Sequence, residues 1–452
     1  MMNKKFLLGL MLAMFVFVLA ACGNSSEEST ESEEEASGDE AVETTEDASE
    51  DEASGDKTTV TFWHAMNGPH QEAITELTNN FNESQDEFEV VEQNQGDYST
   101  LNQSIMASGV SDDLPTLAQA TASNIPDWAS NDLIVPLDDL LAGENFDQEV
   151  LDDIIPGFLE GVSYQDQMMA VPFAKSVRIM YVNDDILEEY DAEVPASFED
   201  IQALGEEMQA AGDDRFALGL EAGVEMELET MARQNGAEWI SDDLSTVDIG
   251  EENATEPMQY IVDGIDAGWA RTAGEDGFMS GPFGRGDVAL YLGSSAGLSH
   301  VEPGAEESGI SWSTAELPVY GGGEPLTLLA GNDLTVFSSA TDEEQEGAAA
   351  FMNFLLQPEN TAEWAMATGY VPVTNEGINT EVYQTYLEEN PNAAAAAAET
   401  EYAIASPMFA GSGEYRDAMT QAQDAILIDG AEVTETMQNL QEETTQIIEE
   451  NN

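Results

Sequence analysis

The pattern that most openly suggests catalysis is Gly293-Ser-Ser-Ala-Gly297, in which Ser295 has the position of a nucleophile at a sharp strand-to-helix turn. A short apolar run, residues 288–292, precedes it directly, as a serine esterase would require. Such an enzyme also needs a histidine that returns from a distant part of the chain to accept the proton. The only histidine after Ser295 is His300, too close in sequence for that return. A secreted esterase that uses Ser295 is therefore a remote alternative.

Other catalytic and metal-binding patterns are missing from the sequence. The chain has one cysteine and three histidines. His64 and His70 stand on a predicted turn with a spacing that does not match a zinc site. The sequence has no phosphate-binding loop of the Walker type, and its carboxylates are too numerous for one pair to stand out as a glycosidase acid and base. We therefore expect no catalytic residues, no metal ion and no cofactor.

The balance of charge excludes several kinds of partner. Ten Lys and Arg stand against 92 Asp and Glu, for a formal net charge of −82. Such a chain repels nucleic acid and anionic membrane surfaces. Self-repulsion also destabilises the folded state and is screened by salt, which suggests an acidic, halophilic type of protein or an alkaline habitat. A site for an anion would need a locally positive region within this acidic chain. The basic residues beyond residue 5 that could supply it are Lys57, Lys175, Arg178, Arg215, Arg233, Arg271, Arg285 and Arg416.

The first 57 residues have the composition of an export signal followed by a tether. Lys4 and Lys5 precede an apolar run over residues 6–21 that is too short for an ordinary membrane span. The run ends in Leu-Ala-Ala-Cys22, the pattern of a bacterial lipoprotein box. We predict a signal peptide over 1–21, lipidation of Cys22, and a disordered acidic tether over 22–57 that holds the body at the outer face of the cell membrane. Cys22 is the only cysteine, so no intrachain disulfide can form.

The rest of the chain alternates strand-like and helix-like segments. Residues 60–63, 88–91 and Leu117 read as strands, with helical spacing at 71–82 and 98–106 between them. This order predicts an α/β fold with a parallel sheet. The body is too long for one ordinary core, so two domains are expected. Further predicted strands are 179–182, 288–292 and 334–337, and further helices are 184–190, one opening with a capping box at Ser197–Asp200, 343–356, 393–398 and 418–448.

Several segments resemble the extracytoplasmic solute-binding proteins of carbohydrate-type ABC importers, and most of all their glycerol-3-phosphate-binding branch. The resemblance covers roughly residues 58–440, and its most specific stretch joins Leu356-Gln-Pro-Glu-Asn-Thr-Ala-Glu-Trp364 to Thr368-Gly-Tyr-Val-Pro-Val373. The other carrying segments are Thr61-Phe-Trp-His-Ala-Met-Asn-Gly68, Gly96-Asp-Tyr98, Val171-Pro-Phe-Ala-Lys-Ser176, Met180-Tyr-Val-Asn183, Gly286-Asp-Val-Ala289 and Gly331.

The resemblance implies a periplasmic-binding-protein-like fold, in which two α/β lobes joined by hinge strands surround a ligand cleft. Lobe 1 would hold residues 58–173 and 322–374, and lobe 2 residues 174–321 and 375–448. Cleft closure would capture a small molecule, and the ABC permease would recognise the closed state. The protein would act as a monomer and perform no chemistry on its ligand.

The resemblance also places six residues in the cleft, and each has a physical case. Hydroxyls and backbone N–H groups of Ser176 and Ser294 at strand ends could meet an anion. Gly331 permits close approach of the backbone. Tyr98 and Tyr370 combine a phenolic donor with a flat apolar face. Arg416 could grip a phosphate with two parallel hydrogen bonds, or could simply neutralise a neighbouring carboxylate.

The sequence departs from the glycerol-3-phosphate branch at two positions. Ala122 stands where that branch has a glutamate for the glycerol hydroxyls, and Phe198 stands where it has a tryptophan. The phosphate side of the ligand is therefore favoured over the glycerol side, and a glycerophosphodiester or a neutral sugar stays open. Trp239, after Arg233-Gln-Asn-Gly236, is the preferred candidate for stacking on a sugar ring, although tryptophans more often lie in the core.

A surface-layer protein and an esterase are the two alternatives to a binding protein. A structural adhesin or surface-layer protein would suit the acidic tether, but it would leave the cleft-type segments unexplained. The esterase lacks a suitable histidine. The sequence therefore favours an ABC-importer lipoprotein that binds a glycerol-3-phosphate-like compound, with a sugar or oligosaccharide ligand as the alternative.

Overall fold

The computed structural model describes residues 57–111 and 113–452. The predicted signal peptide, Cys22 and most of the predicted tether lie outside these residues. Among the helices of the described part, none has the length and apolar composition needed to cross a bilayer.

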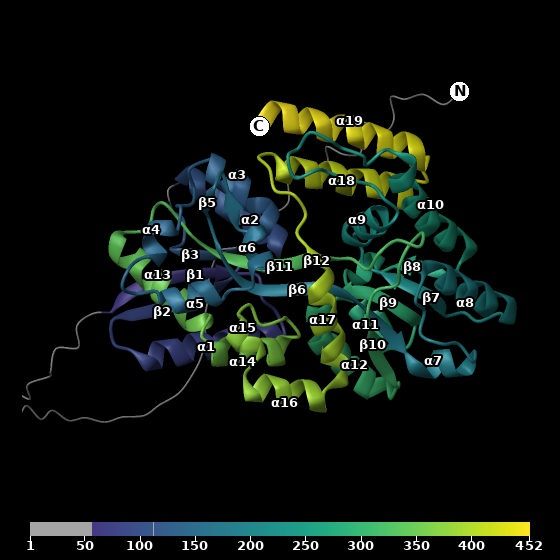
Figure 1. Cartoon of the computed structure of the whole chain (residues 1–452), viewed down its shortest axis with the longest axis horizontal. Helices are drawn as coiled ribbons and strands as arrows, with labels where there is room; N and C mark the ends of the chain where they lie inside the picture. Colours follow the sequence, from purple (N-terminus) through teal and green to yellow (C-terminus); the bar gives the residue numbers. More distant parts are fainter. Residues whose placement is uncertain (1–56, 112) are drawn as a thin grey trace, which may run out of the picture. The chain divides into compact units, whose positions relative to one another are not determined.

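A mixed ten-stranded sheet forms the centre of the fold, with the path β2-β1-β3-β11-β6-β9-β7-β8 (Figure 1). The pairs β1–β2, β1–β3, β7–β8 and β7–β9 are parallel, whereas β11 and β6 run antiparallel to their neighbours on this path. The predicted parallel pairing of the first three strands is therefore confirmed, within a sheet that is mixed overall. The strands of this path are β1 Thr58–His64, β2 Phe88–Asn94, β3 Leu117–Ala120, β6 Val171–Asn183, β7 Phe216–Leu220, β8 Ala270–Thr272, β9 Val288–Ser294 and β11 Thr327–Val336.

Strand β6 joins the two halves of the sheet. All 13 of its residues are buried. It pairs with β11 as far as Val177 and with β9 from Arg178 onward. At this crossing the Thr327 hydroxyl bonds both backbone groups of Arg178, accepting from its N–H at 3.0 Å and donating to its C=O at 3.1 Å. Two short strands extend the sheet, β10 Trp312–Ala315 beside β6 and β12 Ala403–Ile404 beside β11, while β4 Ser163–Tyr164 and β5 Gln167–Met168 form a separate hairpin.

Helices fill the connections between strands, and most begin where the sequence places a start signal. The predicted capping box at Ser197 is present, with the Asp200 N–H donating to the Ser197 hydroxyl at 3.2 Å. Proline begins α1 and α14. The helices of eight residues or more are α1 Pro69–Ser84, α2 Tyr98–Ser111, α8 Phe198–Ala211, α9 Glu225–Gln234, α10 Glu252–Ala267, α12 Leu298–Ser308, α13 Asp342–Leu355, α14 Pro358–Thr368, α16 Glu381–Glu389, α18 Ser412–Leu427 and α19 Val433–Asn451.

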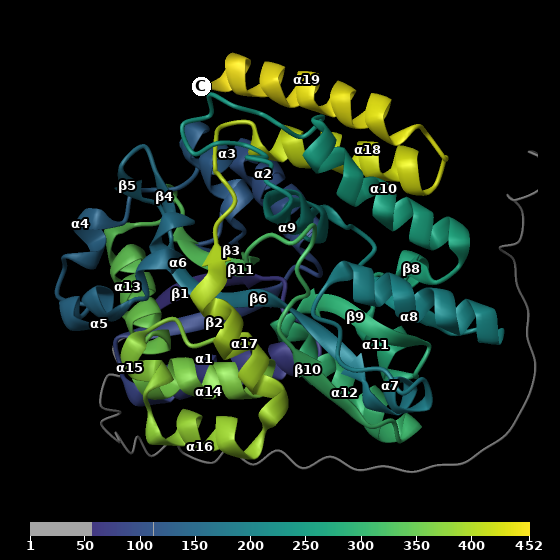
Figure 2. The same ribbon diagram turned by 45° about the vertical axis from the view of Figure 1, so that its right-hand side comes forward.

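Shorter helices complete the chain, and the last two long helices lie side by side in both ribbon views (Figures 1 and 2). The C-terminal segment over about 418–448, predicted as one or two helices, forms two helices, with Gly430 in the turn between them. The short helices are α3 Ile125–Ser130, α4 Asp138–Leu141, α5 Gln148–Asp153, α6 Pro156–Glu160, α7 Asp184–Glu189, α11 Ser280–Gly284, α15 Asn375–Ile378 and α17 Ala394–Glu399, with 3-10 turns at η1 Ala122–Asn124, η2 Gly274–Asp276, η3 Ser295–Gly297, η4 Pro391–Ala393 and η5 Thr400–Tyr402.

Two large apolar clusters form most of the core, and the first of them extends along both halves of the sheet, from Phe62 on β1 to Tyr291 on β9. One contains Phe62 and Phe351, whose rings meet edge to face with centroids 5.7 Å apart. The other contains Leu218 on β7 and Leu440 on α19, so the C-terminal helix is part of this second core. Because each cluster draws on segments far apart in sequence, neither half can form from one continuous stretch of chain.

Candidate functional site

Four of the predicted site residues lie on or beside the β6–β11 pair. Ser176 is buried in β6 opposite Ala330, and Gly331 lies opposite Lys175. Gly331 has a φ of 101°, and a Cβ at this position would overlap the carbonyl oxygen of Ala174. The two strands therefore approach each other here more closely than any side chain at position 331 would allow.

Tyr98 and Tyr370 lie close to each other beside β11, and Asn332 of that strand binds Tyr98. The Asn332 side-chain amide donates to the Tyr98 hydroxyl at 2.8 Å, and Tyr370 is near enough for its phenol to be coupled electrostatically to that of Tyr98. Burial raises the pKa of both phenols, so both stay protonated at neutral pH. Tyr370 stacks on Trp364 at 5.6 Å with an interplanar angle of 13°. The two predicted tyrosines thus form one polar group with an aromatic backing.

The Thr-Gly-Tyr-Val-Pro-Val motif brings Tyr370 to this position. Gly369 ends α14 in a left-handed conformation, with a φ of 80°. The next residues turn onto the sheet, where the Val371 N–H donates to the Lys175 carbonyl at 2.8 Å. The motif therefore ends α14 at Gly369 and then bonds to β6 at Val371, which fixes Tyr370 between the helix and the strand.

Ser294 and Ser295 lie at the end of β9. Ser294 pairs with Arg178 of β6, and its hydroxyl accepts from the Ala296 N–H at 3.2 Å. Ser295 is fully buried, and its hydroxyl has no hydrogen-bond partner within the described residues. The His300 ring packs against the ring of His70 with centroids 4.7 Å apart. Ser295 therefore lacks both solvent access and a general base, which argues against the esterase alternative.

Two buried ion pairs flank Ser176 on β6. The Lys175 ammonium lies 2.6 Å from the Asp333 carboxylate, and the Arg178 guanidinium donates through Nε to Glu227 at 2.7 Å. Burial raises the pKa of Asp333 to about 6 and also raises the pKa of Glu227, although each cation opposes this effect. Both basic residues next to the predicted site are therefore already neutralised by buried carboxylates.

Arg416 differs from these cations. It is exposed on α18, and within residues 57–111 and 113–452 it is the one arginine with no carboxylate oxygen within 4.0 Å. The first turn of α18 is tied to α3, because the N–H groups of Gly411 and Gly413 donate to Asp127 at 2.8 and 2.9 Å. The same helix contacts η1, which carries Ala122. Within the described residues, no hydrogen bond joins the Arg416 side chain to the Tyr98–Tyr370 group.

Trp239 lies in the second core in this structure. Its side chain is 1% exposed, and its indole N–H donates to the Tyr415 hydroxyl at 3.0 Å. It therefore has no open face for a sugar ring here, which corrects the expectation that it faces a ligand. Phe198 is also buried, with its ring edge-to-face against Tyr260 and Tyr320.

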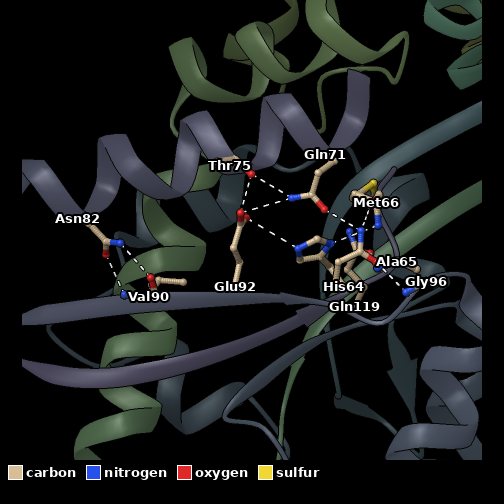
Figure 3. A network of polar contacts seen from close by, with 11 residues as sticks. His64, Ala65, Met66, Gln71, Thr75, Asn82, Val90, Glu92, Gly96 and Gln119 are labelled. Carbon is tan, nitrogen blue, oxygen red and sulfur yellow. Dashed lines mark hydrogen bonds and ion pairs between the residues drawn. The ribbon is translucent and has the colours of Figure 1, made fainter. Parts of the chain in front are cut away.

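A polar network positions the loops that follow β1 and β2 (Figure 3). His64 accepts from the Met66 N–H at 3.2 Å, and Gln119 accepts from the Ala65 N–H at 3.0 Å. Burial lowers the pKa of His64 to about 4, so this histidine is neutral near pH 7. His64 also lies 3.8 Å from Glu92. Because His64 is fully buried, this network supports the structure of the loops.

Cavity volume does not locate the site. An open cavity of about 530 Å³ lies on α14 and α16, where Met366, Val382 and Tyr386 form its apolar wall. A cavity of about 10 Å³, close to the size of one water, adjoins Arg178 and Glu227. None of the predicted ligand residues lines either cavity.

The sequence reasoning missed Asn332, Asp333 and the role of Lys175. A signal was available, because Gly331-Asn-Asp333 interrupts an otherwise apolar run that continues as a strand. Buried polar residues in the middle of a central strand need specific partners. Such an interruption therefore marks a place where another part of the chain, or a ligand, must supply hydrogen bonds.

Comparison with known proteins gives the family. A model described as bacterial extracellular solute-binding protein matches residues 76–395. The chain belongs to this family. The family binds solutes and is not an enzyme family, in agreement with the expectation from the sequence. A curated relative from Rhizobium meliloti, the sn-glycerol-3-phosphate-binding periplasmic protein UgpB, is 30% identical over 74% of this chain and 79% of its own. The Salmonella typhimurium protein of the same name is 24% identical over the same shares.

Solved structures confirm the fold of this solute-binding protein. UgpB from Mycobacterium tuberculosis, in complex with glycerophosphocholine, superposes with a TM-score of 0.78 at 21% identity, covering 87% of this chain and 99% of its own. The GacH receptor of Streptomyces glaucescens, solved without ligand and with acarbose, gives 0.76 at 18% identity over 88% and 100%. At these identities the structures establish a shared α/β solute-binding fold and leave the ligand open.

Proposed function

We propose that this solute-binding protein serves an ABC importer and captures a glycerol-3-phosphate-like compound. The names of the curated relatives support the ligand class, and the unpaired state of Arg416 within the described residues carries it. In a chain with a net charge of −82, a guanidinium without a carboxylate partner provides the uncompensated positive charge that binding of an anion requires. Its planar fork suits the bidentate recognition of a phosphate.

The ligand would lie between Arg416 and the Tyr98–Tyr370 group in the closed protein. Ser176, Ser294 and Gly331 would contribute hydroxyl and backbone groups, since they belong to or adjoin the β6–β11 crossing. Phenolic hydroxyls and an aromatic face suit a polyol. Ala122 offers no acceptor for glycerol hydroxyls, so a glycerophosphodiester belongs to the same proposal.

Closure requires two lobes, which we place at 58–173 with 322–374 and at 174–321 with 375–448. The crossing of β6 between its two partners, at Val177 and Arg178, supports this division. The buried hydroxyl of Thr327 on the neighbouring strand would hold this crossing in place while the lobes rotate about it. The permease would bind the closed form, and the protein would work as a monomer.

The anchoring proposal depends on the sequence of the first residues alone. A lipidated Cys22 and an acidic tether would keep the binding body on the extracellular face of the cell membrane.

A sugar is the second candidate ligand. The GacH receptor and a Thermotoga maritima maltose-bound protein share the fold, and the stacked Trp364–Tyr370 pair is the kind of surface that sugar rings contact. This reading makes Arg416 a surface residue without a role in binding.

A thermal-shift screen with the chain from residue 22 onward, in high salt, separates the two ligands. Its compounds are glycerol 3-phosphate, glycerophosphocholine, maltose and longer oligosaccharides. A ligand at about 100 times its dissociation constant stabilises the fold by about 2.7 kcal/mol. We expect a glycerophosphate compound to raise the melting temperature and Arg416→Ala to abolish the shift. Arg285→Ala is the matched control, since Arg285 is an exposed arginine that pairs with Asp276 and Asp287.

Stabilisation by sugars alone, with Arg416→Ala behaving like the parent, would overturn the phosphate proposal and support the sugar reading. A shift that disappears equally in both arginine variants would point to general electrostatics and would also contradict a specific role for Arg416.

A further inference from the structure

Asn332 carries a buried oxygen atom that the protein does not satisfy. The residue is 0% exposed in the middle of β11. Its amide nitrogen donates to the Tyr98 hydroxyl at 2.8 Å, whereas its Oδ1 has no hydrogen-bond partner among the described residues. Buried side-chain oxygens are nearly always paired in folded proteins, because loss of water without a replacement bond is costly. This oxygen therefore needs a partner from outside the part of the chain that the structure describes.

The neighbouring tyrosines leave one donor unused. Tyr98 and Tyr370 each have one O–H proton, and within the described residues neither O–H donates a geometrically well-formed hydrogen bond to an acceptor. At least one phenolic O–H is therefore free to donate to a ligand. The Tyr98 oxygen already accepts the bond from Asn332. The three side chains thus offer one free donor and one free acceptor at the same place.

We propose that Asn332, Tyr98 and Tyr370 form a subsite for a hydroxyl group of a polyol ligand. A hydroxyl is the small group that both donates and accepts, so it can donate to Asn332 Oδ1 and accept from the unused phenolic O–H. This subsite rests on the proposed glycerophosphate ligand and supplies the oxygen acceptor that Ala122 lacks.

The surroundings favour a neutral hydroxyl over a charged group at this point. The adjacent Lys175–Asp333 pair is buried and self-compensating, so it neither attracts nor repels strongly. Burial raises the pKa of Tyr98, with a smaller contribution from Asp333, which keeps the phenol protonated and able to donate. Tyr98 is the part-exposed member of the three and gives the side from which a ligand would enter.

The test compares a ligand that has hydroxyls with one that lacks them. Titration calorimetry measures the dissociation constants of glycerol 3-phosphate and of n-propyl phosphate with the chain from residue 22 onward, the latter having the phosphate but no free hydroxyl. We expect the parent to prefer glycerol 3-phosphate by about tenfold or more. Asn332→Leu, similar in shape, and Tyr98→Phe should each reduce this preference to about threefold or less, because each removes a group that can bond only the ligand with hydroxyls.

Controls separate a local role from general damage. Tyr164→Phe removes a part-exposed tyrosine hydroxyl that likewise accepts from a side-chain amide, that of Gln165 at 3.2 Å, and it should leave the preference unchanged. Tyr98→Phe decides the question if Asn332→Leu fails to fold. An unchanged preference in folded Asn332→Leu and in Tyr98→Phe would overturn the subsite while the phosphate proposal stands. If the parent binds neither phosphate compound, the proposed function fails and the subsite with it.

Discussion

Gly331→Ala tests whether the close approach of β11 and β6 is required by the fold. Gly331 has a φ of 101°, which a residue with a Cβ adopts only at a cost of about 1–3 kcal/mol. The new Cβ would also overlap the carbonyl oxygen of Ala174, which is backbone and cannot rotate away. Overpacking of this kind adds roughly 1–3 kcal/mol, so the free energy of unfolding should fall by about 2–6 kcal/mol.

The assay is urea unfolding followed by circular dichroism, with Gly430→Ala as the control. Gly430 has a φ of 71°, and an added Cβ there meets nothing within 4 Å. Its replacement should therefore cost only the conformational penalty, about 1–2 kcal/mol. The difference between the two variants measures the overlap alone. If Gly331→Ala is no more destabilising than Gly430→Ala, the tight contact between the strands does not exist in solution and the geometry described around Asn332 is wrong.

Two further predictions concern charge. Lys175→Met leaves Asp333 buried without its cation, which should destabilise the fold by about 3–5 kcal/mol near pH 8. The pKa of Asp333 is already raised to about 6 and should be higher still in the variant, so the loss shrinks as the pH falls from 8 through the variant's pKa to about 6, below which the carboxyl is protonated in both proteins. A destabilisation that is equal at pH 8 and pH 5 in urea titrations would contradict this. Because the net charge is −82, the melting temperature of the parent should rise from low to molar NaCl. A melting temperature that stays constant or falls as the NaCl concentration rises would contradict the proposed adaptation to salt.

Local patterns in the sequence predicted most of the regular elements that were named. Residues 60–63, 88–91 and 288–292 are strands, and 71–82, 98–106 and 343–356 are helices, because their apolar spacing agrees with the face they bury. The full length of β6 could not be predicted in this way. Its buried run contains Lys175 and Arg178, and only the distant carboxylates Asp333 and Glu227 make their burial tolerable.

The same limit applies to the site. The resemblance placed Tyr98 and Tyr370 in one cleft, and the structure adds Asn332, which donates to Tyr98 and which no local pattern singled out. Trp239 illustrates the opposite error, since a tryptophan after a glycine turn could face either way. Its position in the core depends on Tyr415, which comes from a helix far along the chain. Partners of this kind follow from tertiary packing and not from spacing.

The ion pairs explain why one basic residue should decide between a phosphate and a sugar. Lys175 and Arg178 lie next to the predicted site, but an anion that recruited either one would leave Asp333 or Glu227 buried without a partner. Breaking a buried pair in this way costs several kcal/mol, more than a new hydrogen-bonded phosphate contact at the same cation would return. Arg416 carries no such penalty, because it is exposed and has no carboxylate within 4.0 Å among the described residues. Affinity for a phosphate compound should therefore depend on Arg416, whereas Lys175 and Arg178 affect binding through the stability of β6.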